Sequence, residues 1–297
     1  MRILISGASG LIGSALRANL TQRGDETAVL VRRSPSSDEV LWTPGRPLDP
    51  QKLFEFDAIV HLAGKNIAGR WTEKFKREVR DSRVQGTHTL ATAAAASFRQ
   101  CGSPRVFIAA SALGYYGDRG DEVLTEESPP GRGFLPDVCV AWEAAADPAR
   151  DAGLRVAHMR IGVVLAKDGG ALPPLLLPFR LGLGGRIGDG RQYWSWIALE
   201  DVVRAFAFAL HSEEISGPVN VVAPSPVRLS EFVHTLGEVL HRPTVFPLPA
   251  FVIRTMLGEM GKTLLLDSAR VLPEKLERAG YSFEYPQLKD ALRALLK

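Results

Sequence analysis

Residues 2–13 read Arg-Ile-Leu-Ile-Ser-Gly-Ala-Ser-Gly-Leu-Ile-Gly, and this stretch decides the fold. The apolar run before Gly7 is typical of a buried strand, and residues 11–23 space their apolar side chains along one face of a helix. Gly7 suits the tight turn, Gly10 lets the backbone approach a pyrophosphate, and Gly13 allows close packing of helix on strand. The stretch therefore predicts a strand, a phosphate-binding turn and a helix whose free amides hold the anion.

The first 110 residues continue this alternation of strands and helices. Short, continuously apolar runs are typical of strands that are buried on both faces of a parallel sheet. We expect strands at 27–31, 40–42, 57–64 and 105–110, and a long helix at 72–97. The pattern predicts an α/β fold, a Rossmann-type doubly wound parallel sheet with helices on both faces.

The rest of the chain predicts a smaller, mostly helical C-terminal part. The glycine- and proline-rich stretch 169–190 is the best boundary. We expect a cofactor-binding Rossmann domain at 1–168, completed by about 196–223, and a substrate-binding C-terminal part at 169–195 and 224–297. Further elements are expected as helices at 136–150, 200–211 and 229–240, and strands at 155–165 and 218–222.

The end of the second expected strand bears on the choice of dinucleotide. An NAD enzyme usually has an acidic residue about 20 residues after the glycine turn, where it binds the ribose hydroxyls. This chain has Arg32 and Arg33 there. An acid would repel a 2′-phosphate, whereas guanidinium groups bind it through charge-assisted hydrogen bonds. The sequence therefore favours NADP(H) over NAD(H).

Composition excludes several classes of protein. The 297 residues carry 36 Lys+Arg against 33 Asp+Glu, a net charge of +3 that is too small and too evenly spread for a nucleic-acid surface. Cys101 and Cys139 form neither a disulfide framework nor a metal-binding pattern. No apolar run reaches the roughly 18 residues of a membrane span, and no secretory signal precedes the first strand. We expect a cytoplasmic protein with no metal, nucleic-acid or membrane partner.

Several motifs together resemble the extended short-chain dehydrogenase/reductase superfamily. They are the glycine turn, His61-Leu62-Ala63-Gly64, the segment 110–117 (Ala-Ser-Ala-Leu-Gly-Tyr-Tyr-Gly), and Gly188-Asp189-Gly190 followed by 196–202. More narrowly, the chain resembles its atypical epimerase family over essentially all 297 residues. The marks of that family are residues 62–67, Ser82-Arg83, residues 142–145, residues 177–185 and a helical extension from about residue 248.

The resemblance implies a set of cofactor-binding residues and an assembly. The pyrophosphate turn, the adenosine-phosphate contact, the strand end beside the ribose and the nicotinamide loop each match positions of this chain. Arg83 stands where many extended members keep an asparagine that steadies the cofactor. By analogy, a homodimer would pair through helices 72–97 and 136–150. The implied cofactor-binding residues, with Arg33 and Gly64 added as neighbours, are Gly7, Ser9, Gly10, Leu11, Ile12, Gly13, Arg32, Arg33, Leu62, Ala63, Gly64, Arg83, Ser111 and Val164.

The chain departs from the superfamily at the proton relay. In the superfamily that the chain resembles, a Ser, a Tyr and a Lys move the proton together. The lysine lies four residues after the tyrosine, on the same helix face. No Tyr-x-x-x-Lys is present, and Ala112 takes the place of the usual serine. Ser111 and Tyr116 are the catalytic candidates that remain, with Tyr116 as the best proton donor. Glu143 is expected as a helix-surface charge, and His61 and Cys139 as core residues.

Two functions stay open. The first is an NADP(H)-dependent oxidoreductase or epimerase acting on an unidentified hydroxyl or carbonyl compound, with a sugar nucleotide as one option. The second is an NADP(H)-binding regulatory or sensor protein with little turnover, which the missing relay favours. The aromatic cluster Tyr115, Tyr116, Tyr193, Trp194 and Trp196 favours the first if it borders an open, polar pocket, and the second if it fills that pocket.

Overall fold

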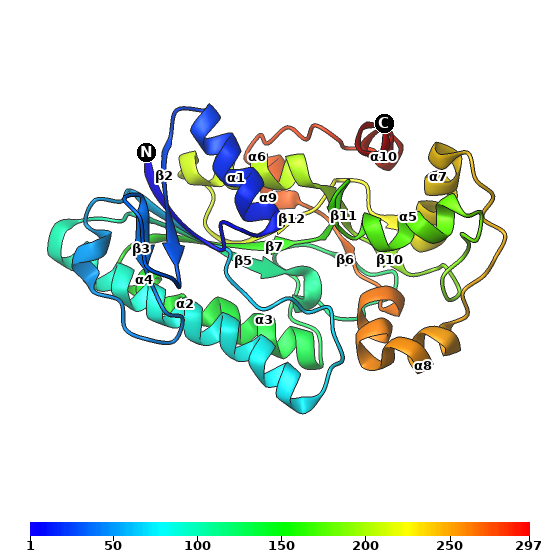
Figure 1. Ribbon diagram of the computed structural model, residues 1–297, viewed down its shortest axis with the longest axis horizontal. Helices are drawn as coiled ribbons and strands as arrows, with labels where there is room; N and C mark the ends of the chain where they lie inside the picture. Colours follow the sequence, from blue (N-terminus) through cyan, green and yellow to red (C-terminus); the bar gives the residue numbers. More distant parts are fainter.

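A seven-stranded parallel sheet forms the centre of the molecule (Figure 1). The structure, a computed structural model, describes all residues from 1 to 297. The strands are short and continuously buried, as the sequence predicts for a sheet covered on both faces. In spatial order they are β12 (Gly217–Val221), β7 (Arg155–Ile161), β5 (Val106–Ala112), β4 (Ala58–His61), β1 (Arg2–Ser6), β2 (Glu26–Val31) and β3 (Glu39–Leu41).

The strand order reverses direction between β1 and β4. From β1 the chain adds β2 and β3 on one side, then returns to add β4, β5, β7 and β12 on the other. All of these neighbours pair in parallel, so their carboxyl ends share one edge of the sheet. The predicted doubly wound fold is confirmed, and such sheets bind ligands beyond the carboxyl ends at the reversal point.

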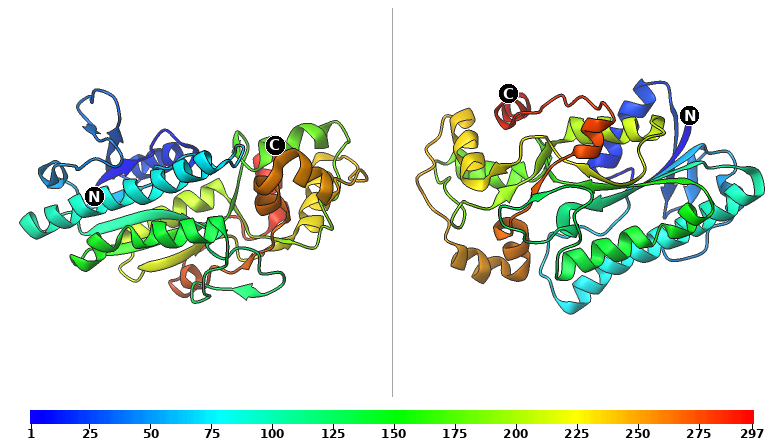
Figure 2. Two further views of the ribbon diagram at one scale, coloured as in Figure 1. Left: turned by 90° about the horizontal axis from the view of Figure 1, so that it is seen from below. Right: turned by 180° about the vertical axis from the view of Figure 1, so that it is seen from behind.

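Helices cover both faces of the sheet (Figures 1 and 2). One face packs against α1 (Leu11–Gln22) and α6 (Leu199–His211), and the other against α2 (Glu73–Cys101), α3 (Phe134–Ala144) and α4 (Asp147–Asp151). The hydroxyl of Thr72 accepts a hydrogen bond from the Phe75 amide at 3.2 Å and so caps α2, which fixes where this long helix begins. None of the helices combines the length and the apolar composition that a membrane crossing requires.

A smaller part with its own hydrophobic core lies beyond the carboxyl edge of the sheet. Its larger helices are α5 (Leu172–Arg180), α7 (Leu229–Leu240), α8 (Ala250–Gly261) and α10 (Leu288–Leu296). A π-helical turn, η3 (Lys262–Leu266), follows α8. Its small sheets join β11 (Trp196–Ala198), β8 (Val163–Ala166) and β9 (Gly169–Gly170), then β10 (Tyr193–Trp194) with β13 (Val227–Arg228), and β14 (Arg270–Val271) with β6 (Val123–Leu124). The remaining short helices are η1 (Pro50–Leu53), η2 (Leu113–Tyr115) and α9 (Glu274–Arg278).

Two expected elements are divided in the structure. The strand expected at 155–165 is β7 followed by β8, which leaves the main sheet to pair with β11. The division falls at Gly162, where a Cβ would lie 2.5 Å from the Ser195 carbonyl oxygen. The helix expected at 136–150 is α3 followed by α4, and Pro148 stands in the first turn of α4, where its missing N–H costs nothing.

The three glycines of the first turn have different structural roles. Gly7 has φ +71°, and a Cβ there would lie 2.8 Å from the Ala63 amide nitrogen. A Cβ on Gly13 would lie 2.2 Å from the Gly7 carbonyl oxygen, so only glycine lets α1 approach β1 this closely. Gly10 has φ −79°, and its only near neighbour would be the Gly7 carbonyl oxygen at 3.3 Å. Packing therefore demands glycine at two positions, but not at Gly10.

We expect Gly13→Ala to destabilise the fold and Gly10→Ala to leave it nearly unchanged. The first adds a methyl group inside contact distance of backbone, an overpacking that costs about 2–3 kcal/mol. The second adds it at a backbone angle that alanine adopts, with the Gly7 carbonyl oxygen at 3.3 Å as its one near neighbour. Chemical denaturation of the two variants measures the difference, and equal losses of unfolding free energy would contradict this assignment.

Candidate functional site

The N-terminus of α1 presents free backbone amides at the carboxyl edge of the sheet. The helix has no side-chain cap and no acidic residue in its first turn, so nothing within the chain neutralises its positive end. Ser9 and Gly10 are exposed, and the amides of Leu11, Ile12 and Gly13 have no intrahelical acceptor. A Cβ on Gly10 would meet only the Gly7 carbonyl oxygen, at 3.3 Å, so no other part of the chain covers the turn where an anion would lie. This geometry fits a pyrophosphate.

The end of β4 lies against the same turn. The amides of Leu62 and Ala63 donate hydrogen bonds to the Ser6 hydroxyl at 3.1 and 3.2 Å, which holds this segment beside Gly7. The Ser6 hydroxyl also lies 2.6 Å from His61 Nδ1. Burial lowers the pKa of His61 to about 4, so the ring is neutral and acts as part of the core. Leu62 and Ala63 are thus placed next to the glycine turn.

Arg32 and Arg33 differ in what they contact. Arg33 forms a two-point ion pair with Glu39, at 2.8 and 2.5 Å, and the Ser36 amide donates to the same carboxylate. The bond from Ser36 and the pair with Arg33 lower the pKa of Glu39 to about 2. Arg32 is exposed and has no ion-pair or hydrogen-bond partner. Arg32 is therefore the free cation at the end of β2, whereas Arg33 ties the β2–β3 loop to β3.

Arg83 connects the segment after β4 to helices α2 and α3. Its Nη1 donates to the carbonyl oxygens of Lys65 and Val79 at 2.9 and 3.2 Å. Its guanidinium lies 5.0 Å from the centre of the Trp142 ring, and its side chain lies beside the exposed Gly64. Burial lowers the pKa of Arg83. These contacts give Arg83 a positioning role for the loop.

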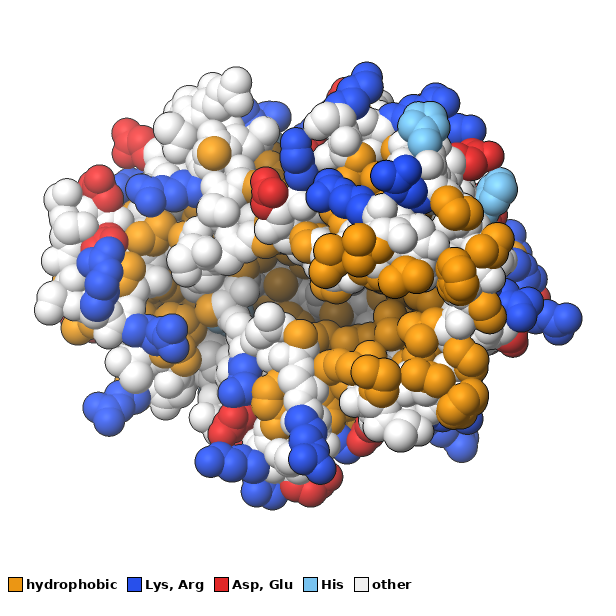
Figure 3. Space-filling model, turned by 45° about the vertical axis from the view of Figure 1, so that its right-hand side comes forward, with side chains coloured by type: hydrophobic (Ala, Val, Ile, Leu, Met, Phe, Trp, Pro, Cys, Tyr) orange, Lys and Arg blue, Asp and Glu red, His pale blue; other side chains and the backbone are white.

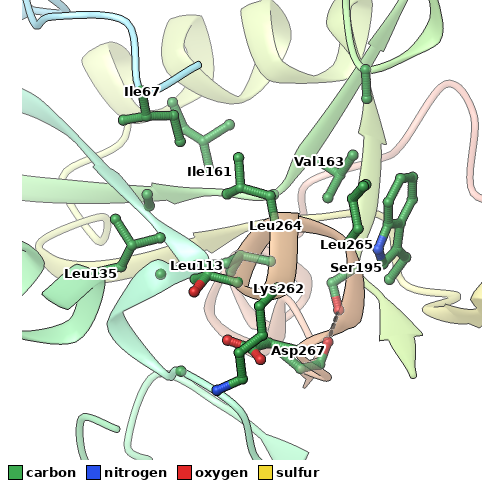
Figure 4. Close-up of a pocket in the computed structure, with 18 of the residues that line it drawn as sticks. Ile67, Leu113, Leu135, Ile161, Val163, Ser195, Lys262, Leu264, Leu265 and Asp267 are labelled. Atoms are coloured by element: carbon green, nitrogen blue, oxygen red, sulfur yellow. Dashed lines mark hydrogen bonds between the residues drawn. The ribbon is translucent and has the colours of Figure 1, made fainter. Parts of the chain in front are cut away.

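A cavity of 740 Å³ opens at the carboxyl ends of β5 and β7 (Figure 4). Its walls come from both ends of the fold: η2 and β7–β8 on the sheet side, α5 and η3 on the C-terminal side. Val164, a predicted cofactor-binding residue, lines it. The cavity lies near the glycine turn, because the Leu11 side chain lies beside Gly169 and Gly170, and Gly170 lines the cavity. The turn and the cavity thus lie at the same edge of the sheet.

Ser111, a predicted catalytic residue, lies in a buried polar network and does not line the cavity. It is 3% exposed, and its hydroxyl donates to Glu143 Oε1 at 2.6 Å. Glu143 in turn pairs with Arg160 through two bonds of 2.9 Å. The expectation that Glu143 is a helix-surface charge is wrong, since its side chain is 13% exposed and holds the buried guanidinium.

Tyr116, the predicted proton donor, also belongs to this network. Its side chain is fully buried, and its hydroxyl accepts from Arg160 at 3.0 Å and donates to Asn220 Oδ1 at 2.7 Å. Burial raises the pKa of Tyr116 to about 12. The neighbouring Leu113, Gly114 and Gly117 line the cavity, but Tyr116 does not. The structure therefore contradicts its assignment as proton donor, because the hydroxyl faces the interior.

The other aromatic residues divide between cavity and core. Tyr193 and Trp194 line the cavity, whereas Trp196 is fully buried. The Arg160 guanidinium lies over the Tyr115 ring, with its central carbon 3.4 Å from the centre of that ring. The cavity is therefore open and is not filled by this aromatic cluster, but 16 of its 29 lining residues are hydrophobic, so it is not the polar pocket that the first function predicts.

Sequence reasoning missed four charged residues that line the cavity, Arg132, Glu259, Lys262 and Asp267, of which the last two are labelled in Figure 4. Lys262 is the first residue of η3 and Asp267 directly follows its last residue, so the two charges flank a segment that contains Leu264-Leu265-Leu266. Burial first, and then the charge of Asp118, raises the pKa of Asp267, while Lys262 opposes the shift. The only sequence signal is a pair of charges enclosing an apolar triplet, and it matches no motif.

Comparison with protein families matches nearly the whole chain. Residues 3–222 match the model of the NAD dependent epimerase/dehydratase family, and residues 248–295 match a domain of unknown function. An epimerase family protein of Mycobacterium bovis is 44% identical over 98% of this chain and 96% of its own length. The human epimerase family protein SDR39U1 is 37% identical over the full length of both chains.

Solved structures show the same relationship. The crystal structure of human SDR39U1 (isoform 2) with NADPH is 34% identical, covers 99% of each chain and has a TM-score of 0.88. A nucleoside-diphosphate sugar epimerase from Corynebacterium glutamicum is 37% identical with a TM-score of 0.81, over 100% of this chain and 58% of that one. With the glycine turn, the sheet order and the C-terminal extension all matched, the chain belongs to the NAD-dependent epimerase/dehydratase family.

Proposed function

We propose that this protein is an NADP(H)-dependent oxidoreductase or epimerase that acts on a hydroxyl or carbonyl compound. The observation that carries the proposal is the open cavity beside the glycine turn, at the edge where parallel α/β sheets bind ligands. Beyond the space that a nicotinamide would take, the lining includes Lys262 and Asp267, ionisable groups that cofactor binding alone does not require. The missing Tyr-x-x-x-Lys pair is the one feature that favours the sensor.

Residues of this chain fit each end of the cofactor. The first-turn amides of α1 would hold the pyrophosphate, and Arg32 would hold a 2′-phosphate. Leu62, Ala63 and Val164 would border the ribose and the nicotinamide. When bound, the reduced nicotinamide supplies a hydride. The human relative whose structure contains NADPH supports this choice of dinucleotide.

The proton requires a different donor from the one that the superfamily uses. Asp267 lines the cavity, and no side chain forms a hydrogen bond or ion pair with its carboxyl group. A raised pKa keeps this carboxyl protonated to higher pH than an ordinary aspartic acid. We assign Asp267 as the group that exchanges a proton with the substrate oxygen, with Lys262 beside it to stabilise its carboxylate form.

We expect Gly10→Val to abolish NADPH binding while the protein stays folded. Valine would occupy the space through which the backbone reaches the pyrophosphate, and Gly10 contacts little else. NADPH fluorescence titration gives the affinity, and thermal unfolding monitors the fold. Unchanged NADPH affinity in a folded variant would remove the turn from the cofactor site and with it the proposed function.

We expect the parent protein to bind NADPH at least tenfold more tightly than NADH, a difference of about 1.4 kcal/mol. Arg32→Ala should erase this preference and leave NADH binding unchanged. Arg33→Ala is the matched control and should retain the preference, because Arg33 is already paired with Glu39. Dissociation constants of both cofactors decide the point, and a preference lost only in Arg33→Ala would reverse the assignment.

We expect Asp267→Asn to slow reduction by about 10² or more in kcat, the usual effect of losing a general acid. NADPH absorbance with a panel of aldehydes, ketones and keto-sugars measures turnover. Tyr116→Phe is the control: it should retain kcat but lose about 1–3 kcal/mol of unfolding free energy, because Asn220 loses its donor. Slow turnover in Tyr116→Phe with normal turnover in Asp267→Asn would refute the assignment.

The same Asp267→Asn variant has a signature that needs no substrate. With its pKa raised above 3.8, Asp267 binds a proton more tightly in the folded state, so the stability it contributes is lost as pH rises through the folded pKa. Asparagine does not titrate. The melting temperature of the variant relative to the parent should therefore increase from acid to neutral pH, and a constant difference would contradict the raised pKa.

A further inference from the structure

The cavity is lined mainly by apolar side chains. Of its 29 lining residues 16 are hydrophobic, and they come from every wall. Leu113 and Leu135 lie on one side in Figure 4, with Ile161 and Val163 from the strands and Leu264 and Leu265 from η3. A ligand in this space exchanges water for hydrocarbon over most of its surface. Such a lining favours a ligand that is itself largely hydrocarbon.

Several polar side chains of the lining already have partners within the protein, whereas Arg132, Lys262, Thr263 and Asp267 do not. The Ser195 hydroxyl donates to the Ala269 carbonyl oxygen and accepts from the Val271 amide, at 2.8 and 2.9 Å. Glu259 pairs with Lys76 at 2.5 Å. A sugar nucleotide carries two phosphates and several hydroxyls, and each loses free energy when buried without a partner. This cavity offers too few partners for it.

The charges of the lining do not match a diphosphate either. The lining holds two cations, Arg132 and Lys262, and two carboxylates, Glu259 and Asp267. A diphosphate site concentrates positive charge, whereas this lining balances it. In its carboxylate form Asp267 would repel a phosphate placed beside Lys262, and in its protonated form it adds no positive charge to hold one. This arrangement accommodates a ligand that places one polar group near Asp267 and Lys262.

An exposed apolar surface, here called the collar, continues from the cavity. Only seven large apolar side chains of the protein are more than half exposed, and all lie in residues 177–183 or 245–256. They are Leu177, Leu181, Leu183, Val245, Phe246, Phe251 and Met256. Figure 3 shows hydrophobic side chains lining the central hollow and continuing across the surface beside it. Their concentration is unusual, since scattered exposure is the norm for a soluble protein.

The collar and the cavity are built by the same elements. In α5, Pro174 and Leu175 line the cavity while Leu177 is 67% exposed. In α8, Glu259 lines the cavity while Met256 is 76% exposed. The two collar segments lie side by side, because Val245 forms a β-bridge with Gly185, just after Leu183. The apolar surface thus extends from the interior of the site to its outside.

We infer that the site binds a lipophilic carbonyl or hydroxyl compound, with its polar end near Asp267 and Lys262 and its hydrocarbon part along the apolar lining and the collar. This inference rests on the proposed function for its chemistry and adds the substrate class. It excludes a sugar nucleotide as the preferred ligand. Exposed leucine, phenylalanine and methionine side chains then serve as the outer part of a hydrocarbon-binding surface.

Calorimetric titration with a series of methyl ketones, from butan-2-one to decan-2-one, tests the inference in the presence of NADP⁺, which allows no reduction. Affinity should rise about fourfold with each added methylene while the chain still gains contact with apolar surface. UDP-glucose, titrated in parallel, should bind more weakly than decan-2-one. An affinity that does not depend on chain length, or tighter binding of UDP-glucose, would overturn the inference.

Variants of the collar then test whether the hydrocarbon part of the ligand lies along it. Phe251→Ser combined with Met256→Ser should weaken decan-2-one binding at least fivefold and leave butan-2-one unchanged, and the exposure of both side chains predicts normal stability. Leu41→Ser, 43% exposed on β3, is the matched control and should change neither. Sedimentation of parent and double variant completes the test. A parent dimer that the double variant converts to monomer, with ketone binding intact, would assign the collar to a second copy and overturn its role.

The two proposals fail in different ways. If NADPH does not bind the parent protein, the proposed function is lost, but the ketone series on the cofactor-free protein still reports on the cavity. If NADPH binds and Gly10→Val abolishes that binding while the ketones show no dependence on length, only the substrate class is wrong.

Discussion

The pairing of Arg160 with Glu143 is the interaction on which the arrangement of the site depends. Arg160 lies in β7, is 3% exposed, and reaches α3 through Glu143 and η2 through Tyr115 and Tyr116. Burial by itself would lower the pKa of Arg160, but Glu143 more than offsets this and the pKa is raised. Removing either partner would leave a buried charge uncompensated, which costs about 3–5 kcal/mol. The pair thus fixes the distance between the sheet and its covering helix.

This pairing also explains why Ser111 and Tyr116, the two predicted catalytic residues, do not line the cavity. The Ser111 hydroxyl points to Glu143, and the Tyr116 hydroxyl lies between Arg160 and Asn220. Asn220 in β12 extends the network to Leu272 and to Glu126, which ties the main sheet to the C-terminal segment. Groups that would face a substrate in a typical member here hold two parts of the fold together. Three of the four charged residues of the cavity, Glu259, Lys262 and Asp267, come instead from α8, η3 and the residue after η3.

The first βα unit imposes the other constraint. Because Gly13 sits against the Gly7 carbonyl and Gly7 against the end of β4, three chain segments meet with no room for a side chain. This contact leaves the amides of α1 directed at the edge of the sheet where the cavity opens. Arg32, at the end of the adjacent β2, remains unpaired because Glu39 binds Arg33 instead. Close packing and one selective ion pair together prepare the site for an anionic ligand.

The sequence by itself determined the doubly wound sheet and the glycine turn that joins its first strand to its first helix. Those features follow from local patterns, since apolar runs and glycine spacing act within a few residues of one another. Only the tertiary structure decided which of Arg32 and Arg33 is free, that Tyr116 and Ser111 face the interior, and that Asp267 faces the cavity. These outcomes depend on pairings between residues more than 30 positions apart in most cases, such as Tyr116 with Asn220. A side chain's partner across the fold fixes its direction, and no periodicity in the chain encodes that partner.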